Sequence, residues 1–235
     1  MKTTLIAIIG LVLIVGTSIF MYKTRPVNIP AQDTTETTST DSKIQTETVE
    51  QKDTTVSNTK TLRIIGTESQ ATFTLKETLS GKDVTVIGVT NSISGDIQLQ
   101  ATNPAKLILG TIKIDARTLK TDNERRNGAI ARMILNSDQQ GNEYITFTAT
   151  DVRGIPAIIE TGKQFSYTIV GNLTIRGTTK PVTFNATSTL NTDGSLSGTA
   201  NATVTYGDFG ISVPDLSFLA NVDKTTTLSI SLLAK

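Results

Sequence analysis

Apolar and polar residues alternate along the second half of the chain in runs typical of β-strands with one buried face. The alternation is clearest in Phe165–Ile175, Val182–Ala186, Leu196–Tyr206 and Thr226–Leu232. Each run places apolar side chains on one face and mainly Thr, Ser, Asn or Lys on the other. A sheet with one apolar and one polar face is typically antiparallel and closes around, or packs upon, its apolar side. The pattern therefore predicts an all-β fold whose centre is an antiparallel barrel.

Two short segments within and between these runs predict local changes of backbone direction. Asn191-Thr192-Asp193-Gly194 separates two alternating runs and predicts a hairpin turn. Gly171-Asn172 lies inside a run, where a glycine indicates a bulge or a tight bend.

One amphipathic helix interrupts the strands. Thr121 and Glu124 have the spacing of a capping box, in which the threonine caps the helix and the glutamate reaches back to it. Ile130, Met133 and Ile134 recur at helical spacing, which predicts a helix of about 12 to 15 residues. The order of elements along the chain is several strands, one helix and then more strands. This order favours a single barrel with a helix across one end.

The first 23 residues have the character of a membrane segment. The run from Leu5 to Tyr22 carries no charge, and as a helix it would be about 27 Å long, close to the thickness of a bilayer core. It ends at Lys23 without the small-residue cleavage site of a secretory signal. We therefore expect residues 1–23 to form an uncleaved transmembrane anchor, with a cleaved signal as the alternative. The rest of the chain would then be extracytoplasmic, in the periplasm or at the cell surface, and secreted if the segment is cleaved.

Residues 24–60 change composition completely. They are rich in Thr, Ser, Glu, Gln and Asp and contain few large apolar residues. Such a segment buries too little apolar surface to offset the entropy of ordering. We expect a disordered linker over 24–60 and a folded barrel domain over 61–235.

Composition removes much of enzyme chemistry. The chain contains no Cys, His or Trp, which excludes thiolate nucleophiles, imidazole bases and Cys- or His-based metal sites. No carboxylate pair shares a strand face at glycosidase spacing, and no oxygen-rich cluster resembles a calcium loop. The net charge of +1 gives no field that would favour nucleic acid. We predict a protein that is not an enzyme and that needs no cofactor or metal.

The apolar stripe of the strands is the candidate binding surface. In a closed barrel its members face inward: Phe73, Leu75, Phe147, Phe165, Tyr167, Ile169, Leu173, Phe184, Val204, Leu228 and Ile230. The pattern alone favours a filled core, which is the usual interior of a small barrel, over a cavity, although barrels of about eight strands can be just wide enough for one small ligand. Arg125 and Arg126, near the helix start, are candidate contacts for a polar head group, with a solvated helix surface as the alternative.

Several segments resemble the YceI-like family in the family's order. They are Ser69–Phe73, Val86–Gly88, Ser94–Ile97, Thr118–Asn127, Val170–Phe184 and Asp208–Ile211. The resemblance implies an extended, lipocalin-like antiparallel barrel of about eight strands, with an apolar tunnel that holds polyisoprenoid or similar amphiphilic chains. Glu68 stands where the family often has His, and Tyr206-Gly207 stands where it usually has Arg.

The resemblance favours a cavity over a filled core. We therefore expect extracytoplasmic binding or transport of a long-chain amphiphile, an isoprenoid or a similar lipid, by a protein held at the membrane through its N-terminal helix. The alternative is a filled barrel that acts as a structural or interaction module of the cell envelope. The sequence leaves a homodimer open.

Overall fold

The structure is a computed structural model that describes residues 59–100, 107–213 and 219–235. The expected transmembrane anchor and residues 24–58 of the expected linker lie outside these ranges. Strand β1 begins at Thr59, two residues before the expected start of the barrel domain. No helix within the described ranges is long and apolar enough to cross a membrane.

Antiparallel strands make up most of the described chain. They are β1 (Thr59–Arg63), β2 (Gln70–Leu79), β3 (Lys82–Thr90), β4 (Ile93–Ser94), β5 (Asp96–Gln100), β6 (Leu107–Leu109), β7 (Ile112–Asp115), β8 (Tyr144–Arg153), β9 (Gln164–Ile175), β10 (Thr178–Leu190), β11 (Leu196–Thr205), β12 (Leu219–Val222) and β13 (Thr225–Ala234). The helical elements are the 3₁₀ turns η1 (Gly66–Glu68), η2 (Ala116–Thr118) and η4 (Tyr206–Phe209), the α-helix α1 (Glu124–Ala129) and the π-helical turn η3 (Ile130–Ile134).

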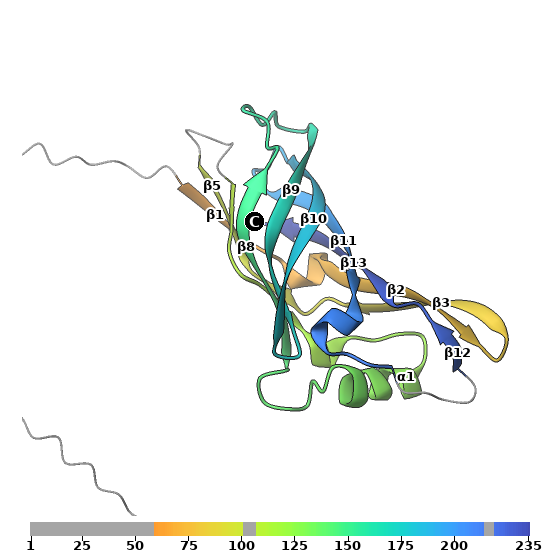
Figure 1. The fold of residues 1–235 in the computed structure, drawn as a ribbon. Helices are drawn as coiled ribbons and strands as arrows, with labels where there is room; N and C mark the ends of the chain where they lie inside the picture. The colour runs from red at the N-terminus through yellow and green to blue at the C-terminus, as the bar shows by residue number, and fades with distance from the viewer. Residues whose placement is uncertain (1–58, 101–106, 214–218) are drawn as a thin grey trace, which may run out of the picture. The chain divides into compact units, whose positions relative to one another are not determined.

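The larger sheet curls into a nearly closed barrel. Its strand order is β12-β2-β13-β11-β10-β9-β8-β7-β4, and β3 pairs with β2. The chain passes from β3 into β4 within two residues, and β4 pairs with β7 at the other end of the order. The backbone nitrogen of Asp115 also donates to the carbonyl of Ser92 at 2.9 Å, which ties β7 to the β3–β4 connection. This confirms the prediction of an all-β antiparallel barrel with one helix (Figure 1).

A smaller sheet, in the order β1-β5-β6, completes the wall at one end of the barrel. Its first strand leads into an isolated bridge between Ile64 and Ala234 of β13. The backbone nitrogens of Arg63 and Lys235 each donate to the other residue's carbonyl, at 2.6 and 2.9 Å. The last residue of β1 and the last residue of the chain therefore lie side by side, near the label C in Figure 1.

The alternating runs become the strands that the sequence predicts. β9 and β10 pair along their whole length, with Phe184 opposite Ile169 and Ala186 opposite Tyr167. The predicted hairpin turn connects β10 to β11, where the nitrogen of Gly194 donates to the carbonyl of Asn191 at 2.9 Å. Gly194 has a φ of 77°, a left-handed conformation that glycine adopts without steric cost.

The bulge lies across from Gly171 rather than at it. β9 runs through Gly171-Asn172 without interruption, and the register shift falls in β8 between Ala149 and Asp151. A Cβ on Gly171 would lie 2.5 Å from Cζ of Phe147 and 2.5 Å from the carbonyl oxygen of Thr148. The glycine is therefore needed for the close approach of the Phe147 ring, and the prediction of a bulge was right for the region but wrong for the strand.

The helix is capped by a different residue from the one predicted. The Oδ1 of Asn123 accepts hydrogen bonds from the backbone nitrogens of Arg125 at 3.0 Å and Arg126 at 3.1 Å. Thr121 instead uses its hydroxyl to donate to Oδ1 of Asn127 at 2.8 Å. The capping-box prediction was wrong because Asn123, another strong cap former, lies directly before the first helical turn.

Candidate functional site

The apolar interior of the barrel contains two cavities of different size. The large cavity measures about 450 Å³, within the range of small-molecule sites. The small cavity measures about 40 Å³, enough for little more than ordered water. The stripe of inward-facing side chains thus encloses usable space at one end of the barrel and is packed at the other.

The large cavity lies between the strands and the helical segment that follows Asn123. Its apolar strand residues are Phe73, Leu75, Leu79, Val86, Ile145, Ile175, Val204, Val222 and Leu228. The opposite wall comes from residues near α1, η3 and η4: Leu119, Ala129, Ile130, Met133, Ile134, Leu135, Tyr206, Phe209, Ile211 and Val213. Met133 is 53% exposed, so the cavity reaches solvent beside the helix.

The charged groups of the large cavity lie where α1 meets β2. Nη2 of Arg126 is 3.0 Å from Oε1 of Glu77, and Nη1 is 2.6 Å from Oδ1 of Asp122. Only 20% of the Arg126 side chain and 11% of the Glu77 side chain are exposed, so this contact holds α1 against β2. The Arg125 side chain is exposed and has no ion pair within the described ranges. Of the two predicted head-group residues, Arg125 is thus the one whose charge is unpaired there.

Arg176 fixes the far end of the helical segment. It occupies the tight turn between β9 and β10 with a φ of 51°, and Gly177 follows with a φ of 72°. Its Nη1 donates to the carbonyl of Ile134 at 3.3 Å. The guanidinium thus bonds one of the carbonyls that a helix end leaves free.

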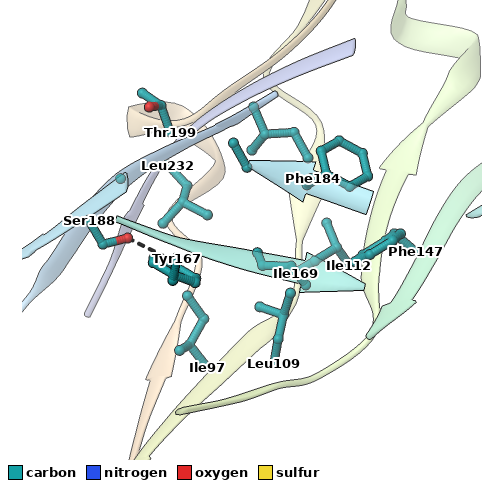
Figure 2. Close-up of a pocket in the computed structure, with 13 residues that line it drawn as sticks. Ile97, Leu109, Ile112, Phe147, Tyr167, Ile169, Phe184, Ser188, Thr199 and Leu232 are labelled. Atoms are coloured by element: carbon teal, nitrogen blue, oxygen red, sulfur yellow. Dashed lines mark hydrogen bonds between the residues drawn. The ribbon is translucent and has the colours of Figure 1, made fainter. Parts of the chain in front are cut away.

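The other half of the interior is filled by aromatic and branched side chains (Figure 2). The rings of Phe147 and Phe184 meet edge to face with centroids 5.0 Å apart. Phe165 stacks on Tyr167 at 5.5 Å. The Tyr167 and Ser188 hydroxyls are 3.0 Å apart and hydrogen-bonded. Burial raises the pKa of Tyr167, and the hydrogen bond to Ser188 opposes part of that rise.

The predicted site residues divide between these two halves. Phe73, Leu75, Val204 and Leu228 line the large cavity together with Arg125 and Arg126. Phe147, Tyr167, Ile169, Phe184 and Ile230 line the small cavity. Phe165 and Leu173 are buried but line neither of the two. Contact of any of them with a ligand stays a prediction.

The strand pattern missed the helical wall of the large cavity. Ile130, Met133 and Ile134 had been noted only as the apolar face of a helix, and that spacing was the available signal. Ile211 and Val213 follow the buried Phe209 in an irregular segment, where no periodicity marks them. Half of the site therefore comes from residues outside the barrel strands.

The arrangement can hold an apolar molecule and orient a polar end. Its lining is mostly hydrocarbon, and its polar members are Asn123, Arg125 and Arg126 at the helix start, Glu77 on β2, Thr226 on β13 and Tyr206 in η4. Within the described ranges, no three His, Cys, Asp or Glu residues lie close enough together to hold a metal ion.

Comparison with known proteins agrees with this geometry. A profile of the YceI-like domain matches residues 62–234. The crystal structure of BcnA from Burkholderia cenocepacia aligns with a TM-score of 0.57 at 17% identity, over 73% of this chain and 99% of that one. A polyisoprenoid binding domain from Saccharophagus degradans, implicated in plant cell wall breakdown, aligns with a TM-score of 0.59 at 12% identity, over 74% and 97%. A search of curated proteins gives no match.

Proposed function

Because this chain belongs to the YceI-like family, we propose that it binds an amphiphile whose apolar chain is buried in the large cavity. The observation that carries the proposal is the cavity of about 450 Å³, lined by hydrocarbon and edged by charged groups at the helix start. The related domain from Saccharophagus degradans is described as polyisoprenoid binding, which supports an isoprenoid or a similar lipid as the ligand class.

Hydrophobic burial supplies the affinity. A chain that buries on the order of 400 Å² of apolar surface gains roughly 10 kcal/mol before the costs of ordering. The cavity walls come from strands and a helix that are hydrogen-bonded to one another, so little of that gain is spent on ordering the protein. No charge pairing is required for tight binding.

The polar head lies at the helix start. Arg126 is already neutralised by Glu77 and Asp122, both within ion-pair distance. Arg125 is exposed at the edge of the same cavity. Arg125 therefore orients an anionic or hydroxylated head group. Arg126 instead holds α1 against β2 and so stabilises the wall of the site.

The proposal includes a carrier role without catalysis. The chain would hold the amphiphile outside the cytoplasm, as a protein anchored through residues 1–23 or secreted after their removal. What supports this part is the sequence pattern of the N-terminal segment and its polar linker. No partner other than the lipid and the membrane is needed.

The test is displacement of a fluorescent apolar probe from the purified barrel, together with mass spectrometry of its lipid extract. We expect a long-chain amphiphile in the extract and saturable displacement by added isoprenols. Val204→Phe fills the large cavity from β11 and should weaken displacement at least tenfold at an unchanged melting temperature.

Thr203→Phe is the matched control. Thr203 is the preceding residue of β11 and is exposed on the outer face, so this variant should bind as the parent does. If the parent binds no amphiphile, or if Val204→Phe binds as well as the parent, the carrier function fails. The barrel would then be the structural module of the alternative hypothesis.

A further inference from the structure

We propose that Arg176 is a positioning residue for amphiphile binding: from the turn between β9 and β10 it holds the helical wall of the large cavity, formed by α1 and η3, over the bound chain. This inference rests on the proposed function and adds the residue that sets how long the ligand is retained.

The turn that carries Arg176 has a backbone conformation that suits arginine poorly. Ile175 pairs with Thr178, and the two residues between them, Arg176 and Gly177, have φ angles of 51° and 72°. Positive φ at both central residues is the type I′ hairpin turn, whose first position favours Asn, Asp or Gly. A long side chain adopts this conformation only at a cost in free energy. Such a residue persists where the contacts around it offset that cost.

The contacts of Arg176 are with the end of the helical wall. Its Nη1 donates to the carbonyl of Ile134 at 3.3 Å. In the amide orientation that gives both polar atoms of Asn136 a partner, Oδ1 of Asn136 accepts from Nε and Nη2 of Arg176 at 3.2 and 2.9 Å. The Nδ2 of Asn136 then donates to the carbonyl of Arg132 at 2.6 Å. We call Arg176, Asn136 and the carbonyl of Ile134 the latch.

The helical wall has few other polar attachments to the barrel. Within the described ranges, hydrogen bonds and ion pairs connect residues 121–142 to the strands and their turns at two places, the latch and the pair of Arg126 with Glu77. Between these two places, Ile130 and Met133 line the large cavity. Their side chains border free space when the site is empty, so the wall depends on its two ends for its position.

The latch joins two walls of the same cavity. Ile175, directly before Arg176, lines the large cavity from β9, and Ile134 lines it from η3. Met133, the neighbour of Ile134, lies where the cavity reaches solvent. Loss of the latch would let η3 move away from β9 beside this opening. The rate of ligand dissociation should therefore increase.

The turn between β2 and β3 supplies a matched control. Leu79 pairs with Lys82, and Ser80 and Gly81 between them have φ angles of 49° and 77°, so the turn type is the same. Ser80 is exposed and does not line the large cavity. An asparagine suits the first position of either turn, but only at Arg176 does it remove the latch.

The experiment measures the release of a dansyl-labelled farnesol from the purified protein after rapid mixing with excess unlabelled farnesol. Arg176→Asn should raise the dissociation rate about tenfold, while the better turn offsets the lost hydrogen bonds and keeps the melting temperature close to that of the parent. Arg176→Lys keeps the charge without the planar fork and should release the probe nearly as fast as Arg176→Asn. Ser80→Asn should release it at the parent rate.

Hydrogen exchange of backbone amides is a second readout that needs no ligand. At the end of the wall, the nitrogens of Leu135 and Ser137 donate to the carbonyls of Ile130 and Ala131, both at 2.8 Å. These two amides should exchange about tenfold faster in Arg176→Asn than in the parent, because the wall opens locally more often. The control variant should exchange as the parent does.

Asn136→Gly removes the latch from the other side. Asn136 has a φ of 48°, and glycine keeps this left-handed helix end while it deletes the oxygen that Arg176 bonds. The variant should speed release and exchange, and its combination with Arg176→Asn should add little, since both changes break the same contact.

The outcomes separate the latch from the proposed function. A folded Arg176→Asn protein that releases the probe at the parent rate would refute the role of Arg176 and leave the proposed function intact. Equal acceleration by Ser80→Asn would refute it as well. A parent that binds no farnesol would refute the proposed function itself, and faster exchange in Arg176→Asn would then still support Arg176 as the residue that holds the wall.

Discussion

The two halves of this barrel share their strands and their alternating pattern, but one is filled and the other is hollow. In the filled half, the wall between β13 and β8 is completed by the small sheet, whose Ile97 and Leu109 reach the small cavity. In the hollow half, the interior is covered by α1 and η3. Their side chains are separated from the strands by the large cavity, which has a volume of about 450 Å³. The covering element, and not the apolar stripe, therefore decides whether a stretch of this barrel encloses space.

The strongest test of the comparison uses two isoleucines of β9. Ile169 and Ile175 are 5% and 6% exposed and share one face of the strand, but they line the small and the large cavity respectively. Ile169→Ala should reduce the free energy of unfolding by about 2–5 kcal/mol, because it removes close contacts from a packed core. Ile175→Ala should cost only about 1–2 kcal/mol, because its side chain lacks partner atoms on the cavity side.

Denaturant unfolding of both isoleucine variants measures this difference, and probe displacement supplies the second readout. Ile175→Ala should weaken amphiphile binding, while a folded Ile169→Ala should not. Equal losses of stability in the two variants would mean that the halves do not differ in packing.

The second test uses two glycines that face aromatic rings. A Cβ on Gly171 would meet both the Phe147 ring and the carbonyl oxygen of Thr148 at 2.5 Å, so Gly171→Ala should cost about 1–3 kcal/mol. A Cβ on Gly88 would lie 2.0 Å from Cε1 of Phe73, but this ring borders the large cavity and can move into it. Gly88→Ala should therefore cost less than about 1 kcal/mol and should weaken binding instead.

Thermal unfolding and probe displacement measure both glycine variants. A Gly88→Ala barrel that melts as early as Gly171→Ala would contradict the presence of free space next to Phe73. A Gly88→Ala barrel that binds normally would show that the ring had moved away from the ligand.

The third test loosens only the hollow half. Asn123→Ala removes the cap of α1 and should cost about 1 kcal/mol, with weaker amphiphile binding because the helix is one wall of the site. Asn123→Ser keeps a side-chain oxygen at the cap and should restore most of both quantities. Binding unchanged in the alanine variant would separate the helix from the site.

The smallest effect acts only on the filled half. Burial raises the folded-state pKa of Tyr167 above its unfolded value near 10, so its contribution to stability is complete below pH 10. That contribution is lost as the pH rises through the folded-state pKa. Tyr167→Phe should flatten this alkaline decline in the free energy of unfolding and remove a late component from the phenolate absorbance titration. An unchanged titration would place the Tyr167 hydroxyl in solvent.

Much of the fold was predictable from alternation alone. Phe165–Ile175 and Val182–Ala186 lie in β9 and β10, and Asn191–Gly194 forms the turn after them. These features depend on local periodicity and turn chemistry, which the sequence carries directly. The helix cap did not follow, because Thr121 and Asn123 are both good cap formers, and the Thr121 hydroxyl bonds the Asn127 side chain instead of the first helical turn.

The site was predictable only in part. Tyr167 and Leu228 belong to equally clear alternating runs, yet one lines the small cavity and the other the large one. Cavity volume is a sum over side chains from many strands and from the covering helix, and no single run contains that sum. Arg125 and Arg126 line the large cavity, but the β2 residue that neutralises Arg126, Glu77, lies 49 residues away in sequence.

The paired backbones of Arg63 and Lys235 determine how this barrel can be held. Both chain ends of the described domain lie beside the filled half. A bead, a chip surface or a fused reporter attached to either end would therefore hold the barrel at its filled half. The opening beside Met133 would stay clear, and binding measured on an immobilised barrel should equal binding in solution. The same contact suits circular permutation: a peptide long enough to run past β1 could join Lys235 to Thr59 at the other end of that strand, with new termini cut at the exposed Gly81 turn between β2 and β3.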